Sequence, residues 1–217
     1  MNLLVLALAP VFIILIYIYV RDKYKKEPIQ LLLKALFLGI LITIPISFVE
    51  GLLSSLYLPA TQTGSAFYRA FVVAAFTEEL FKYLALFLLI WRHKEFDEHF
   101  DGIVYAVFIS LGFAAAENVM YIYSYGTQTG YIRAITAVPA HAIFGITMGY
   151  FFSLAKFSFQ NTSINMFKAL AIPILLHGIY DFIIMVEQPL ILLAFIPFLI
   201  YLWVGGFKKM KALSRNR

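Results

Sequence analysis

Long apolar stretches alternate with short polar segments along the whole of this 217-residue chain. Each apolar stretch has about the 20 residues that an α-helix needs to cross the hydrocarbon core of a bilayer. The pattern therefore predicts an all-α fold, a polytopic transmembrane helix bundle of about seven spans. We place the spans at residues 2–20, 31–56, 67–91, 102–124, 131–155, 166–186 and 190–207.

The composition agrees with a membrane protein, because 62% of the residues are hydrophobic and only 13% are charged. Cysteine is absent, which excludes disulfides, iron–sulfur clusters and thiolate metal sites, so any metal must be held by His and carboxylate. The formal charge of +5 does not indicate nucleic acid, because basic residues crowd a C-terminal tail that flanks the membrane. These tail residues are Lys208, Lys209, Lys211, Arg215 and Arg217.

The basic residues between the spans predict the orientation. Arg21, Lys23, Lys25 and Lys26 crowd the first loop, which by the positive-inside rule is cytoplasmic. The loops at 58–66 and 124–130 contain no Lys or Arg, whereas those at 92–95 and 156–168 carry positive charge. The alternation predicts that the N-terminus lies outside and the C-terminus inside. Because the connections are short, we interpret residues 1–217 as a single domain in the cell membrane.

Carboxylates or histidines lie in the interiors of four of the predicted spans, although a charge at the bilayer centre costs at least about 2.5–3.5 kcal/mol. At 1.5 Å per residue, all of them fall between the midplane and the outer surface. One shared layer predicts one shared site, either of an intramembrane enzyme or of an ion pathway. The residues are Glu78, Glu79, Glu117, His141, His177 and Asp181. Glu50, late in the second span, either joins this layer or faces the outer interface.

Spacing within the helices refines this hypothesis. Residues four apart share a face, so Glu78 is predicted to pair with Lys82, while Glu79 points about 100° away and is left for chemistry. A purely structural Glu–Lys pair is the alternative. His177 and Asp181 are also four apart, so Asp181 either ligates a metal or orients the imidazole.

His141, at a similar depth on another helix, adds a second imidazole to this set. Two imidazoles and a carboxylate are common ligands of catalytic Zn²⁺, so we predict His141, His177 and Asp181 as ligands. Glu117 is either a further metal ligand or a hydrogen-bond acceptor for one of the ligand side chains. Spacing alone leaves open a metal-free site in which the histidines bond the water and the oxyanion.

The chemistry that these groups favour is hydrolysis by an activated water. Cysteine is absent and no serine shares the polar layer, so a covalent nucleophile is not indicated. Glu78 or Glu79 would act as the general base. A Zn²⁺ ion held by the histidines would lower the pKa of the water to about 7.

Small residues, prolines and two arginines complete the predictions. Gly112, Gly145 and Gly149 predict close helix packing. Proline near each histidine, at 139 and 173, either loosens the helix to admit water or is an ordinary membrane proline. Arginine near the outer ends of two spans, at 69 and 133, either docks a substrate or reaches the lipid headgroups.

Five motifs follow one another along the chain: TEELFK at 77–82, FDEHFDGIVY at 96–105, LGFA with EN at 111–118, PAHA at 139–142 and LHGIYDF at 176–182. Together with Glu27-Pro28 in the first loop, they resemble the motifs of the PrsW family of membrane proteases. The resemblance implies a bacterial membrane protease that makes the first, extracytoplasmic cut in a single-pass anti-sigma factor of the RsiW type. A second intramembrane protease would then complete the release of the sigma factor in a stress response.

A more distant resemblance is to CAAX-prenyl endopeptidases and bacteriocin-processing membrane proteases. It implies a catalytic Glu pair and two histidines, matched here by Glu78, Glu79, His141 and His177. The basic residue here is Lys82, whereas those enzymes have an Arg one position further along the helix. Asp181, four residues after the second histidine, takes the place of an Asn. An ionised Asp cannot donate to an oxyanion, so this departure favours Asp181 as a ligand or imidazole orienter.

Two other classes of protein are compatible with a buried polar layer. A proton-coupled transporter or cation channel could use the carboxylates and histidines as a relay. The chain has no convincing internal repeat of the kind that many secondary transporters show, which argues against that class. A non-catalytic membrane scaffold is the third possibility, but it has little reason to keep six ionisable groups inside its spans.

Overall fold

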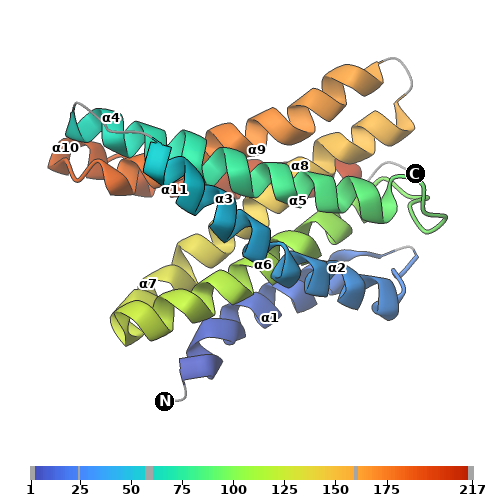
Figure 1. The fold of residues 1–217 in the computed structure, drawn as a ribbon. Helices are drawn as coiled ribbons and strands as arrows, with labels where there is room; N and C mark the ends of the chain where they lie inside the picture. The colour runs from blue at the N-terminus through green and yellow to red at the C-terminus, as the bar shows by residue number, and fades with distance from the viewer. Residues whose placement is uncertain (1–2, 24, 57–60, 159–160, 215–217) are drawn as a thin grey trace.

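The computed structural model describes residues 3–23, 25–56, 61–158 and 161–214, and every element within these ranges is a helix (Figure 1). The elements are α1 Leu3–Arg21, α2 Ile29–Leu41, α3 Thr43–Leu56, α4 Gln62–Phe67, the π-helical segment η1 Tyr68–Phe76, α5 Thr77–Ile90, α6 Asp101–Tyr125, α7 Thr127–Ile135, α8 Ala137–Phe157, α9 Thr162–Met185, α10 Pro189–Leu192 and α11 Phe195–Leu213. The predicted all-α bundle is confirmed.

Within the described part of the chain, six helical stretches are long and apolar enough to cross a membrane. They match six of the predicted spans: Leu3–Arg21, Ile29–Leu56, Asp101–Tyr125, Thr127–Phe157, Thr162–Met185 and Pro189–Leu213. The orientation of the bundle stays a prediction. Residue 2 of the first predicted span, part of the predicted loop at 58–66, and the tail residues Arg215 and Arg217 lie outside the described residues.

The remaining predicted span, 67–91, corresponds to a run of helix from 62 to 90 that joins α4, η1 and α5 without a gap and ends one residue earlier than predicted. It carries Arg69, Glu78, Glu79 and Lys82, which sets its composition apart from that of the six apolar stretches. The π-helical segment ends directly before the two glutamates, and π-helical turns are frequent at functional sites. This charged run of helix thus also contains irregular backbone, directly before the two glutamates.

Helix α6 lies at the centre of the bundle and is buried along most of its length, with α1, α2, α5 and α8 packed around it (Figure 1). Glycines permit the closest contacts. A Cβ atom added to Gly112 would lie 2.1 Å from the carbonyl oxygen of Leu36, and one added to Gly149 would lie 2.2 Å from that of Gly102. The predicted close packing at Gly112 and Gly149 is therefore confirmed.

Substituting Gly112 tests this packing. We expect Gly112→Ala to lower the free energy of unfolding by about 1–3 kcal/mol, because the backbone of α2 must move away from α6. Gly51→Ala is the matched control, since a Cβ atom there meets nothing within 4 Å. Thermal unfolding in detergent micelles measures both. Equal midpoints for Gly112→Ala and the wild type would show that the two helices are not in close contact.

The loop between α1 and α2 is attached to α6 by buried polar groups. The Tyr105 hydroxyl donates to the Glu27 carboxylate, and both side chains are buried. Burial is the main reason why the pKa of Glu27 is raised, to about 7. The same loop is attached to the segment before α6 by Lys25, whose ammonium lies 3.1 Å from Glu95 and 2.6 Å from Asp97. These contacts hold the ends of α1, α2, α5 and α6 together.

Candidate active site

Four of the residues predicted for the site converge in the interior of the bundle. Glu78 and Glu79 come from α5, His141 from α8 and His177 from α9, and one ligand atom of each lies within 4.8 Å of the others. All four side chains are buried. Residues up to 99 positions apart in the chain therefore meet in one cluster, as the shared layer predicted.

Lys82 lies at the centre of this cluster and is almost completely buried, with 1% of its side chain exposed. Its ammonium donates to Glu78 Oε2 and Glu79 Oε1, both at 2.9 Å, and lies 3.3 Å from His141 Nδ1. The prediction that Glu79 is left unpaired is wrong, because residues three apart on a helix are neighbours as well as residues four apart. One lysine thus serves both carboxylates.

Carboxylates lie at both nitrogens of His177. Its Nδ1 atom is 3.0 Å from Glu79 Oε1, and its Nε2 atom is 3.3 Å from Asp181 Oδ2. The ring also stacks on Phe144, with 4.9 Å between the ring centroids. These contacts fix the orientation of the imidazole. Asp181 itself lies outside the four-residue cluster.

Glu117 links His141 to Arg133. The Glu117 Oε2 atom lies 3.0 Å from His141 Nε2 and accepts a hydrogen bond of 2.7 Å from Arg133 Nη2. Arg133 Nε donates in addition to Asn118 Oδ1 at 2.9 Å. Arg133 therefore turns inward, toward Glu117 and Asn118, and Glu117, like Asp181, lies outside the four-residue cluster.

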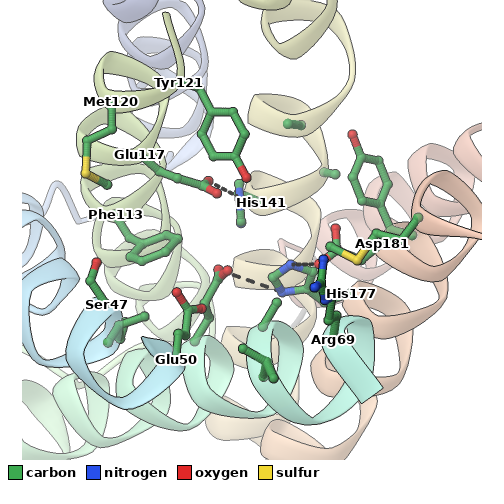
Figure 2. Close-up of a pocket in the computed structure, with 18 of the residues that line it drawn as sticks. Ser47, Glu50, Arg69, Phe113, Glu117, Met120, Tyr121, His141, His177 and Asp181 are labelled. Atoms are coloured by element: carbon green, nitrogen blue, oxygen red, sulfur yellow. Dashed lines mark hydrogen bonds and ion pairs between the residues drawn. The ribbon is translucent and has the colours of Figure 1, made fainter. Parts of the chain in front are cut away.

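A cavity of about 430 Å³ lies over the cluster (Figure 2). Glu78, His141 and His177 line it, whereas Glu79 is not among its lining residues. Glu50 and Arg69 also line the cavity, from α3 and η1. Of the two positions predicted for Glu50, the one within the polar layer is confirmed.

Backbone irregularities lie near the site. The predicted span 131–155 is two helices, since the chain breaks at Thr136 between α7 and α8, and Pro139 lies in the first turn of α8. The first turn of a helix has backbone N–H groups without intrahelical partners, so a proline costs little there. Pro173 instead lies within a continuous α9. The break at Thr136 lies three residues before Pro139, where a loosened helix was one of the two predicted alternatives, whereas nothing in the sequence had indicated the π-helical segment before Glu78.

The cluster offers the donors that a divalent metal ion would need. Carboxylate oxygens and imidazole nitrogens are the ligands of catalytic zinc sites. The Glu79 Oε2 atom is buried and has no hydrogen-bond partner among the described residues, so its lone pairs are free for an ion. The Lys82 ammonium, however, contacts three of the four residues, so an ion held there would have to share those ligands with it or displace it.

Comparisons with known proteins agree with this chemistry. Residues 27–204 match the family model described as "PrsW family intramembrane metalloprotease". The chain is 38% identical to Protease PrsW of Oceanobacillus iheyensis, covering all of this chain and 98% of that protein. It is 36% identical to Protease PrsW of Bacillus subtilis, over 94% of this chain and 92% of that one. No solved structure matches the chain.

The protein is therefore a peptidase embedded in the membrane. Its fold is a helical bundle with candidate membrane spans and a buried Glu/His cluster. The match covers most of the chain, and the relatives share more than 30% of its residues over nearly their whole length. The chain belongs to the PrsW family of intramembrane metalloproteases.

Proposed function

We propose that this chain is an intramembrane endopeptidase that makes the first, extracytoplasmic-side cut in a single-pass anti-sigma factor. This cut starts the regulated proteolysis that releases an extracytoplasmic-function sigma factor. The observation that best supports a hydrolytic activity is the buried Glu/His cluster, which lies beneath a cavity. The choice of substrate rests on the resemblance of the five sequence motifs to the PrsW family and on membership of that family.

Glu78 is proposed as the general base that activates the attacking water. It lines the cavity and is therefore accessible to a water and a scissile peptide. A general base must lie within hydrogen-bond reach of the proton that it removes. Glu79, which does not line the cavity, holds Lys82 and His177 in place instead.

The two histidines face the cavity and are each held by carboxylates. Glu117 bonds His141, while Asp181 and Glu79 bond His177. Carboxylates behind an imidazole fix the orientation of the ring and raise its basicity. We propose that both rings contact the water or the oxyanion, and that Glu117 and Asp181 act as positioning residues.

The alternative role of the two rings is to bind a metal: Glu79, His141 and His177 would then hold a divalent ion such as Zn²⁺, a set of two histidines and one glutamate. Such an ion would supply a Lewis acid for the scissile carbonyl. Glu78 would then stay available at the cavity as the base.

The test is cleavage of an epitope-tagged single-pass anti-sigma factor in membranes that contain the wild-type chain or His177→Ala. We expect cleavage to fall by at least about 10²-fold, because the ring lies within the cluster, and the purified variant to lose bound zinc. His99→Ala is the control, since His99 lies in the segment before α6. A correctly inserted His177→Ala protein that cuts normally would refute the proposal, and proton or cation flux would then test the transporter alternative.

A further inference from the structure

A second cavity, of about 670 Å³, lies on the other side of α8 from the Glu/His cluster. It is a groove between α1 and α11, with α8 and the end of α7 beneath it. Pro139, Ala142 and Ile146 line it from α8, whereas His141 and Phe144 face the first cavity. The groove is therefore separate from the proposed active site.

The lining of the groove is apolar and long. None of its lining residues is charged, and α1 contributes residues from Val5 to Ile18. At 1.5 Å per residue, this stretch of α1 measures about 20 Å. That length exceeds half of the roughly 30 Å hydrocarbon core, so the groove can accommodate an extended acyl chain.

The two ends of the groove differ in charge. Arg21 follows the α1 lining residues by one turn, and its Nη1 atom donates to the hydroxyl of Tyr17, which lines the groove, at 3.0 Å. The Nε atom of Arg21 is buried and has no hydrogen-bond partner among the described residues. On α11, Lys211 lies one turn beyond Phe207, another lining residue. The opposite end is bounded by Val5 and Ile135, which are apolar.

We propose that this groove binds an anionic phospholipid, with an acyl chain along α8 and the headgroup phosphate between Arg21 and Lys211. The guanidinium of Arg21, which lies beside Tyr17 at this end of the groove, and the Lys211 ammonium would donate to the phosphate. Basic pockets between transmembrane helices are typical sites for anionic headgroups on the cytoplasmic side, where the positive-inside rule places this end.

Charge also decides against the other apolar occupants. A single transmembrane helix normally carries Lys or Arg at its cytoplasmic end, which would meet Arg21 and Lys211. A second copy of this chain would bring the same two basic residues to the same end. Like charges at that depth repel, whereas a phosphate neutralises them.

The experiment is native mass spectrometry of the purified full chain after exchange into micelles with equal amounts of phosphatidylglycerol and phosphatidylcholine. We expect the wild type to retain phosphatidylglycerol about tenfold or more over phosphatidylcholine, and Arg21→Gln/Lys211→Gln to lose this preference. Lys208→Gln is the control. Lys208 is exposed and follows Phe207 by one residue, so its side chain points about 100° away from the face of α11 that lines the groove.

Ala9→Phe provides a second variant that keeps both charges. Ala9 lines the groove and is exposed, so the larger ring fills the groove without entering the core. It should reduce the retention of phosphatidylglycerol by a similar factor. Equal retention of the two lipids by the wild type, an unchanged preference in the double variant, or a dimer that Ala9→Phe dissociates would each overturn the proposal.

Discussion

Glu78→Gln is expected to lower the rate of peptide cleavage by at least about 10²-fold, because the amide cannot accept the proton of the attacking water. Gln has nearly the shape of Glu, so the wall of the cavity stays in place. Lys82 keeps its 2.9 Å contact with Glu79, so the buried ammonium remains paired. The measurement is the initial rate of cleavage of a tagged single-pass substrate in proteoliposomes.

Two further variants make this result specific. Glu187→Gln removes a carboxylate from the exposed segment between α9 and α10 and should cut at the wild-type rate. Glu79→Gln should also reduce cleavage, but with a loss of stability, because Glu79 holds both Lys82 and His177. If Glu78→Gln is stable and fully active while Glu79→Gln is inactive, the assignment of the base to Glu78 is wrong.

The sequence predicted the bundle well because a membrane restricts the choices. A bilayer admits only long apolar helices, so the lengths of the apolar stretches locate the spans. The cost of burying charge then made the ionisable residues informative, and depth along each helix placed Glu78, His141 and His177 in one layer. These two constraints predicted the shared layer, whereas the convergence of the four side chains also depends on which way each helix faces.

The contacts between side chains could not be predicted from the sequence, because they depend on the direction in which each helix faces. Arg133 was predicted either to dock a substrate or to reach the headgroups, but the turn at Gly126, where φ is 86°, brings α7 back against α6, and Arg133 bonds Glu117 instead. The π-helical segment Tyr68–Phe76 rotates the faces of the helix before Glu78, and no residue type there signals it. Lys82 contacts both glutamates because its long chain reaches positions three and four residues away.

Lys82→Met is expected to destabilise the metal-free protein by about 3–5 kcal/mol, because it leaves two buried carboxylates without their cation. The hydrophobic side chain replaces the lysine stem but not its charge. Thermal unfolding in detergent micelles with a chelator present would measure the loss. Lys34→Met, on the exposed face of α2, is the control and should unfold close to the wild type.

Zinc should reverse much of the loss in Lys82→Met. A divalent ion on Glu79, His141 and His177 would restore positive charge to the cluster, and it would no longer compete with an ammonium for these ligands. The variant should therefore bind zinc more tightly than the wild type, by isothermal titration, and gain more thermal stability from it. If zinc stabilises the wild type and Lys82→Met equally, the ion and the lysine do not share these ligands, and the metal lies elsewhere or plays no part at this cluster.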